Sequence, residues 1–255
     1  MRIATWNVNS LRARLPKVID WLTRHGVDVL LMQETKLADD AAPEVPFRTV
    51  GYELAHYGEG RWNGVAIASR VGLAEVQRGF GGGPDPQGAR FIAAVCRGIR
   101  VASLYAPNGR EVGSAFWTAK LDWYVRLRAW LAAQDPAASF VLGGDFNVAP
   151  TDLDVWDPAA FAGATHVTPE ERAAFAALLD WGLVDVYRLR HPEGGRFSWW
   201  DYRAGSFHKG QGMRIDHLLA TRPLVPRLVA AEIDREARKN PIPSDHAPVV
   251  ADLAD

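Results

Sequence analysis

The sequence contains a single cysteine, Cys96, among its 255 residues. One cysteine cannot form an internal disulfide and cannot supply a thiolate metal site, so both of these classes of domain are excluded. Such a chain suits a reducing compartment. The start MRIATWNVNS has no charged leader, no apolar stretch and no cleavage site, so we expect a cytoplasmic protein that is not secreted.

The sequence also lacks long hydrophobic runs and an excess of charge of either sign. No apolar segment approaches the ~18–20 residues that a membrane span needs, so we expect no membrane association. The 29 basic and 30 acidic residues give a net charge of −1, which excludes a histone-like polycation. Nucleic acid remains a possible partner, because a catalytic cluster of carboxylates offsets a basic surface in the sum. Only five of the 29 basic residues are lysines, and the arginines that remain favour planar contacts with phosphate.

Short apolar runs alternate with helical patterns along the chain, which is typical of an α/β fold. No repeat, low-complexity linker or change of composition divides it, so we predict one domain, residues 1–255. A Gly- and Pro-rich stretch at residues 79–88 is predicted as an exposed loop. The predicted strands are 2–6, 27–32, 65–68, 91–95, 101–105, 140–142, 215–220 and 249–253. The predicted helices are 11–25, a long one across 117–131, and 169–181, where Thr168 and Glu171 form a capping box.

Polar side chains follow several of the predicted strands, at the point where each strand ends. Such residues, dispersed in sequence but held on one rigid sheet, are typical of a single assembled site. Carboxylate and amide oxygens suit a hard cation such as Mg²⁺, and this set contains no soft ligand. One histidine beside carboxylates is the minimum for acid–base chemistry near neutral pH. The residues that end strands are Asn7, Asn9, Gln33, Glu34, Tyr105, Asn108, Asp145 and Asn147; Asp216 lies inside RIDHLLA, and Asp245 and His246 lead into the last strand.

The sequence resembles the exonuclease III family of abasic-site DNA endonucleases, in the endonuclease/exonuclease/phosphatase superfamily. GDFN and SDH indicate only the superfamily, whereas QETK, YAPNG and PTDLD indicate the exonuclease III branch. The resemblance runs from residue 1 to about residue 253 and is carried by WNVNSLRAR, QETK, LYAPNG, GGDFNVAPTDLD, WGLVDVYR, RFSWWDYR, GMRIDHLLA and SDHAP.

This resemblance implies both a fold and an activity. The implied fold is a two-sheet α/β sandwich flanked by helices, with four layers in the order α/β/β/α, as in DNase I. The implied cofactor is Mg²⁺ or Mn²⁺. The implied reaction is hydrolysis of the phosphodiester 5′ to abasic sites, with trimming of blocked 3′ ends of double-stranded DNA, in base excision repair. We expect the enzyme to be a monomer.

The resemblance also implies roles for individual residues. Glu34 has an alternative role as the ion-pair partner of Lys36, and Asn7 and Asp145 have alternatives as turn residues. Asn9 stands where other branches of the family have Asp, so the site has one negative charge less. The implied metal ligands are Glu34, Asn7, Asp245, Asp145 and Asn147. The implied catalytic residues are Asp145, Asn147, His246, Asp216 and Tyr105.

His246 needs an orienting partner, and Asp245 is its neighbour in sequence. Adjacent residues in extended chain point apart, so we expect the more distant Asp216, which the resemblance supports, and Asp245 is then free to face the metal. The sequence leaves open whether Asp145 or His246 takes the proton, and whether His217 has a role.

Asp145 and Asn147 flank Phe146, so in an extended segment both would point to the same side. Such a pair could hold the attacking water and a phosphate oxygen.

Two further groups concern DNA. Residues 186–246 hold 11 basic against 7 acidic residues, which favours contacts with phosphate. The candidates for phosphate contacts are Asn108, Asn9, Arg203, Lys209 and Arg214, with Arg188 and Arg190 in the same basic group. Trp199, Met213 and Ile215 fall where the family lines a small apolar pocket for a deoxyribose without its base. The alternative is that these three belong to the core.

Two other functions stay open from the sequence. A phosphoesterase for lipid or inositol head groups would share the fold, but the WWDYR and PTDLD segments argue against it. A catalytically silent DNA-binding paralogue would belong to another class, and the complete set of polar residues argues against that more strongly. The sequence therefore favours a DNA repair nuclease.

Overall fold

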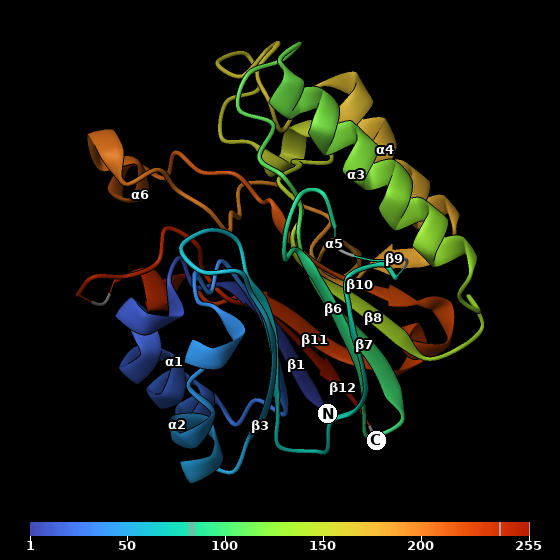
Figure 1. The fold of residues 1–255 in the computed structure, drawn as a ribbon. Coiled ribbons are helices and arrows are strands. Elements are labelled where there is room, and N and C mark those ends of the chain that lie inside the picture. The colour runs from blue at the N-terminus through green and yellow to red at the C-terminus, as the bar shows by residue number, and fades with distance from the viewer. Residues whose placement is uncertain (82, 84, 240, 255) are drawn as a thin grey trace.

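The computed structural model describes residues 1–81, 83, 85–239 and 241–254. Two six-stranded sheets pack face to face, and helices cover their outer sides (Figure 1). Helices α1 (Leu11–His25) and α2 (Glu44–Thr49) pack on the first sheet, and α3 (Ala115–Ala132) and α4 (Pro169–Asp180) pack on the second. The four-layer α/β/β/α sandwich that the sequence predicts is confirmed.

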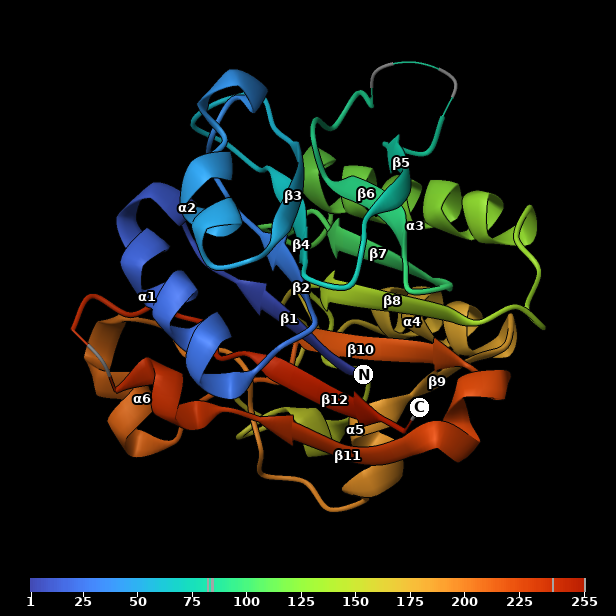
Figure 2. The same ribbon diagram turned by 90° about the horizontal axis from the view of Figure 1, so that it is seen from below.

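Each strand belongs to only one of the two sheets (Figure 2). The first has the order β11 (Leu228–Ile233), β12 (Val249–Leu253), β1 (Arg2–Asn7), β2 (Val29–Gln33), β4 (Val65–Ser69) and β3 (Glu53–Tyr57). The second has the order β5 (Ala74–Arg78), β6 (Phe91–Cys96), β7 (Ile99–Tyr105), β8 (Phe140–Asp145), β10 (Asp216–Thr221) and β9 (Leu183–Asp185).

The remaining helical segments are short. They are α5 (Val186–Arg190), α6 (Ser206–Lys209) and the 3₁₀ helices Asp39–Ala41, Asp152–Asp154, Arg203–Gly205, Arg222–Arg227 and Arg235–Arg238. Among the described residues, no helix combines the length and the apolar character that crossing a membrane requires.

The central strands are buried on both faces, because each sheet lies between the other sheet and a layer of helices. In β2, Leu31 packs between the sheets, whereas Leu30 and Met32 pack toward α1 and α2. In β8, Val141 packs between the sheets and Leu142 toward α3 and α4. This double burial explains why these strands read as continuous apolar runs.

Parallel pairing places the functional end of the sandwich. β1 is parallel to β2, and β7 is parallel to β8, so their carboxyl ends lie at one end of the sheets. β12 runs antiparallel to β1, with Arg2 opposite Asp252, so both termini lie at the other end (Figure 1). The first and last of the described strands are therefore neighbours in one sheet.

The structure also tests the predicted elements. All eight predicted strands are present, and Gly26 ends α1 in the left-handed conformation with φ 58°. The 79–88 segment has no helix or strand among its described residues, and residues 82 and 84 lie outside them. The sequence did not predict β3, β5, β9 and β11, which are the four edge strands of the two sheets.

Candidate active site

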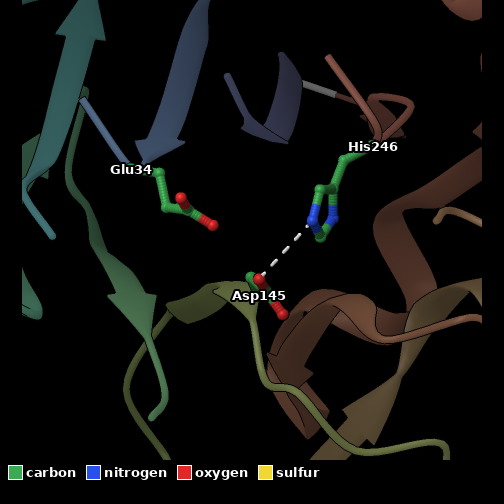
Figure 3. Close-up of side chains that lie close together, drawn as sticks. All are labelled: Glu34, Asp145 and His246. Atoms are coloured by element: carbon green, nitrogen blue, oxygen red, sulfur yellow. Dashed lines mark ion pairs between the residues drawn. The ribbon is translucent and has the colours of Figure 1, made fainter. Parts of the chain in front are cut away.

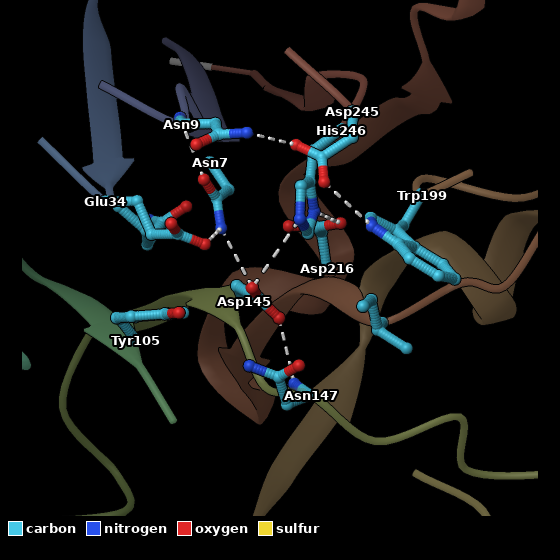
Figure 4. Close-up of polar contacts among 12 residues, drawn as sticks. Asn7, Asn9, Glu34, Tyr105, Asp145, Asn147, Trp199, Asp216, Asp245 and His246 are labelled. Carbon is cyan, nitrogen blue, oxygen red and sulfur yellow. Dashed lines mark hydrogen bonds and ion pairs between the residues drawn. The ribbon is translucent and has the colours of Figure 1, made fainter. Parts of the chain in front are cut away.

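The polar residues predicted at the strand ends converge at the carboxyl ends of the parallel strands (Figure 4). Asn7 ends β1, Tyr105 ends β7 and Asp145 ends β8, while Glu34 directly follows β2. Asp216 begins β10, where it lies opposite Asp145 in the antiparallel register. Two sheets thus contribute side chains to one site.

Glu34, Asp145 and His246 form the centre of this site (Figure 3). One ligand atom from each lies within 4.8 Å of the others, and His246 Nε2 lies 3.8 Å from Asp145 Oδ2. Asp145 is only 2% exposed, and a buried carboxylate requires compensation by a cation or by donors. Carboxylate oxygens with one imidazole nitrogen are suitable donors for a divalent cation. These residues therefore fit the metal that the family resemblance implies.

Asn7 links the two carboxylates. Its Nδ2 donates to Glu34 Oε1 at 2.8 Å and to Asp145 Oδ2 at 2.9 Å. Its Oδ1, which would be needed for metal ligation, accepts instead from the backbone N–H of Asn9 at 3.0 Å. In this structure Asn7 orients the carboxylates, and its oxygen does not join the cluster.

Glu34 also forms the alternative contact considered from the sequence. Lys36 Nζ lies 2.9 Å from Glu34 Oε2 and donates to Asn9 Oδ1 at 2.6 Å. Glu34 and Lys36 lie beyond the end of β2 at Gln33, and both have positive φ, 52° and 53°, so this segment is not an extended strand. Burial would raise the pKa of Glu34, but Lys36 and Asn7 lower it below its usual value, which favours the carboxylate.

His246 is oriented by Asp216. Its Nδ1 lies 2.8 Å from Asp216 Oδ2, which also accepts from the Ser198 hydroxyl at 2.7 Å. Burial alone would lower the pKa of His246, but the carboxylates of Asp216 and Asp145 raise it to about 10. The two carboxylates therefore favour the charged imidazolium over the neutral ring.

Both carboxylate oxygens of Asp245, which is expected to face the metal, are engaged by neighbouring donors. Its Oδ1 accepts from Asn9 Nδ2 at 2.9 Å, and its Oδ2 accepts from Trp199 Nε1 at 3.2 Å. The Asp245 carboxylate can accept both hydrogen bonds only because Asn9 and Trp199 are donors. An aspartate at position 9, as in other branches of the family, would have no N–H to donate. Asp245 therefore lies on the side of the site next to Trp199.

Asp145 has an unusual environment for a carboxyl group. Burial raises its pKa to about 7, and the nearby Asp216 and Glu34 carboxylates add to the shift although His246 opposes it. Its Oδ1 accepts from the backbone N–H of Asn147 at 2.9 Å. Asn147 has φ 51°, so the segment is a tight turn and not the extended segment that the sequence analysis assumed.

Asn147 and Asn108 are joined to each other. Asn108 Nδ2 donates to Asn147 Oδ1 at 3.3 Å, and Asn147 Nδ2 donates to the carbonyl of Ala106 at 2.9 Å. The side-chain amide of Asn147 is thus engaged by two protein groups, the Asn108 amide and the Ala106 carbonyl. It flanks Asp145 where a water or a phosphate oxygen would be held.

Tyr105 presents a neutral phenol to the site. Burial raises its pKa well above its usual value, and the Glu34 and Asp145 carboxylates raise it further. The Arg90 guanidinium lies 4.7 Å from the centre of its ring. A protonated phenol beside Glu34 is a hydrogen-bond donor that adds no charge.

Arg214 is not available to DNA, contrary to expectation. It is 1% exposed and donates to Asp154 and Asp185, each at 2.7 Å. Two buried carboxylates compensate the buried guanidinium, so its place is in the interior. Arg188 likewise bonds to Asp154, whereas the side chain of Arg203 is 88% exposed beside Asp201.

The other basic and histidine residues considered from the sequence are also either exposed or held by contacts within the protein. Lys209 and Arg190 are both exposed, and Arg190 also bonds to the carbonyl of Leu228. His217 is buried, with Nε2 3.0 Å from the carbonyl of Val148, and its ring packs against Phe146. Its contacts indicate a structural role.

The three residues predicted for the abasic pocket lie together in one apolar cluster with Ala149 and Val155. Met213 and Ile215 are 1% and 3% exposed, so only the half-buried Trp199 offers surface. The backbone of Trp199 bridges to both Met213 and His246. The cluster therefore adjoins His246.

Two features were not predicted from the sequence. A cavity of about 360 Å³ lies beside Glu34 and Tyr105, lined by basic and aromatic side chains that include Lys36, Trp62, Arg90, Arg110 and Phe116. The other is a buried Lys120–Glu171 pair behind the site, with 2.5 Å between Nζ and Oε1. The sequence contains one indication that Lys120 is buried. Its helical spacing places it on the same face as Trp123, Tyr124 and Leu127, which are buried residues of α3.

Comparisons with known proteins agree with this geometry. Residues 4–246 match the Endonuclease/Exonuclease/phosphatase family. The chain is 32% identical to exodeoxyribonuclease III of Haemophilus influenzae, over 99% of this chain and 100% of the relative.

Two solved structures are similar over nearly their whole length. One is a 3′ phosphatase from Neisseria bound to a product DNA hairpin, with 38% identity, a TM-score of 0.97 and coverage of 100% of both chains. The other is an AP endonuclease from Archaeoglobus fulgidus, with 38% identity, a TM-score of 0.96 and coverage of 99% of both chains. The family is metal-dependent, and the Glu34, Asp145 and His246 cluster suits a metal. The chain therefore belongs to the endonuclease/exonuclease/phosphatase family, as a DNA phosphodiester hydrolase of the exodeoxyribonuclease III type.

Proposed function

We propose that this chain is a Mg²⁺-dependent repair nuclease that incises duplex DNA 5′ to abasic sites and trims blocked 3′ ends. The observation that carries the proposal is the pairing of two unequal groups, the buried Asp145 carboxyl and the Asp216-bound His246, beside Glu34. Mn²⁺ is the other ion that these donors suit. A single buried cysteine suits the reducing cytoplasm, and we take the enzyme to act there as a monomer.

The residues divide the work of hydrolysis as follows. Asp145, whose pKa is raised to about 7, holds the attacking water and takes its proton. His246 already carries a proton, so it stabilises negative charge on the phosphate oxygens, and Tyr105 donates a hydrogen bond to them. A divalent cation held by Glu34 and Asp145 would supply charge neutralisation at the phosphate and the leaving oxygen.

The surface beside this site supports nucleic acid as the substrate. The cavity next to Glu34 combines three cationic side chains, Lys36, Arg90 and Arg110, with aromatic rings. Cations that neutralise phosphates and rings on which bases stack are the usual elements of a nucleic-acid surface. A lipid or inositol head group would need no such pairing of charges and rings.

The test uses two duplexes, one with a single abasic-site analogue and one with a 3′-phosphate end. We expect Mg²⁺-dependent product from both and none in EDTA. Similar relatives include a 3′ phosphatase and an AP endonuclease, so each duplex measures one arm of the proposal. Product from neither duplex with Mg²⁺ or Mn²⁺, or undiminished cleavage in EDTA, would refute it.

The selectivity for abasic sites has its own variant. Trp199 is the half-buried one of the three predicted pocket residues, so Trp199→Ala should lower the ratio of abasic to intact-duplex cleavage while 3′-phosphate removal persists. An unchanged ratio in the folded variant would place Trp199 in the core and the selectivity elsewhere.

A further inference from the structure

Lys120 is buried in a position where lysine is rarely found. It lies in α3 with 0% exposure, on the face that packs against the second sheet and α4. α3 and α4 run side by side on the outer face of that sheet (Figure 1). Glu171, in the first turn of α4, is also 0% exposed and is its ion-pair partner. A charged pair on this side of the sheet requires a reason beyond packing.

The ammonium of Lys120 contacts both loops that carry the site asparagines. Its Nζ donates to the carbonyl of Asn147 at 2.7 Å, to the carbonyl of Asn108 at 3.3 Å and to Glu171 Oε1 at 2.5 Å. An ammonium has three protons, so each acceptor receives one. Asn108 follows β7 and Asn147 follows β8, and Lys120 joins the two loops from behind.

Glu171 fixes Lys120 to the start of α4. Its Oε2 accepts from the backbone N–H of Thr168 at 3.1 Å and from the Thr168 hydroxyl at 2.8 Å. The Thr165 hydroxyl lies 2.8 Å from Glu171 Oε1 and 3.0 Å from the carbonyl of Asn108. A helix cap, an ion pair and two active-site loops therefore form one buried network.

The packing around the network is tight. Gly109 has φ +86°, and a Cβ there would lie 2.9 Å from Thr165 Oγ1 and 3.0 Å from Lys120 Cδ. The loop after β7 therefore has no room to move toward α3. A displacement of either carbonyl would be transmitted to the side chains in front of it.

We propose that Lys120, held by Glu171, is a positioning residue that sets the separation of the Asn108 and Asn147 loops. This separation aims Asn147, and with it Asp145, at the scissile phosphate. The inference rests on the proposed nuclease function. Stability alone does not require the pair, since apolar side chains of similar volume often replace a buried ion pair without loss.

The test compares kcat and KM for DNA hydrolysis in three variants. The double variant Lys120→Met/Glu171→Gln removes both charges, and a glutamine can still complete the capping box of α4. Thr165→Val removes only the hydroxyl beside the Asn108 carbonyl, on a half-buried loop. Lys239→Met is the matched control, because Lys239 pairs with Glu236 at the surface, 2.6 Å apart.

We expect kcat of the double variant to fall by about 10- to 100-fold with KM within about threefold, as for a displaced catalytic group. Thr165→Val should show a smaller loss of the same kind, and Lys239→Met should match the wild type. In an Asn147→Ala background, the double variant should cause little further loss of kcat, because the side chain that it positions is gone.

Two results overturn the inference. One is a folded double variant whose kcat is near that of the wild type. The other is a double variant that lowers kcat by the same factor in the Asn147→Ala background as in the wild type. If circular dichroism shows that the double variant does not fold, Thr165→Val decides by the same two criteria. A wild type that cleaves neither duplex would refute the proposed function instead, so the two failures are distinguishable.

Discussion

At the scale of single residues, the site depends on unequal environments for groups that lie a few ångströms apart. Burial raises the pKa of Asp145 to about 7, whereas Asp216 and Asp145 hold the pKa of His246 at about 10 against the effect of burial. The carboxyl group can therefore exchange a proton near neutral pH, while the imidazole keeps its own. This asymmetry favours Asp145 as the base and His246 as the cation in the proposed mechanism, a choice that the sequence left open.

Asp145→Asn tests the assignment of the base. An amide keeps the shape and the contact with the backbone N–H of Asn147 but cannot take a proton. We expect kcat to fall by roughly 10²–10⁴, as for the loss of a general base, while DNA affinity is retained or increased. The measurements are single-turnover rates and DNA binding. A rate within about threefold of the wild type would remove Asp145 from the chemistry.

The pairing of Asp216 with His246 makes a prediction about additivity. The two side chains meet at 2.8 Å, whereas Asp245 bonds to Asn9 and Trp199. Asp216→Ala and His246→Ala should therefore be strongly non-additive in kcat, because either change disables the same unit. Losses that multiply in the double variant would show that the two residues act independently.

At the scale of elements, the start of α4 connects sequence, stability and the site. Thr168 and Glu171 form the capping box that the sequence predicts, with the Thr168 hydroxyl 3.2 Å from the backbone N–H of Glu171. The same Glu171 then holds Lys120 behind the asparagine loops. The cap therefore serves both the helix and the network.

Thr168→Ala should lower the free energy of unfolding by about 1 kcal/mol, because the first turn loses its side-chain acceptor. Thr23→Ala is the control, since Thr23 is exposed and its hydroxyl bonds only to carbonyls of its own helix. We expect less than about 0.5 kcal/mol for the control. Urea denaturation measures both values, and equal losses would contradict a capping role.

The elements that the sequence predicted and those it missed differ in their burial. Central strands such as β2 and β8 are buried at every residue, so they appear as uninterrupted apolar runs. The edge strand β5 is mostly exposed, and β11 is buried at only some positions, so neither has such a run. Edge strands form because a partner strand is present, which a local pattern does not reveal.

The sequence predicted which residues gather at the site better than it predicted where each side chain lies. Polar residues at strand ends indicated that Glu34 and Asp145 would meet, whereas Asp216, at the start of the antiparallel β10, was assigned to the site by the family resemblance. Arg214 was misplaced because the burial of a guanidinium depends on its partners, Asp154 and Asp185, which come from distant segments. Lys120 was missed for the same reason.

At the scale of the whole molecule, the candidate active site and the two termini lie at opposite ends of the sheets. The carboxyl ends of β1, β2, β7 and β8 form the site, and the N- and C-termini lie at the opposite end (Figure 1). The net charge is −1, so attraction to DNA depends on where the basic groups lie and not on their total number. The cavity beside Glu34 gathers three of them.

Arg110→Gln tests this distribution of charge. Arg110 lines the cavity beside Glu34, and its guanidinium lies 3.8 Å from the ring centre of Phe116. If it neutralises one phosphate, its loss should weaken DNA binding equally for all sequences and reduce the slope of log Kd against log salt by about 1. Arg227→Gln is the control, because Arg227 bonds to the carbonyl of Ala254 at the far end of the sheets. Affinity measured by fluorescence anisotropy at several salt concentrations gives both slopes. The same slope for Arg110→Gln and the wild type would mean that DNA follows another surface.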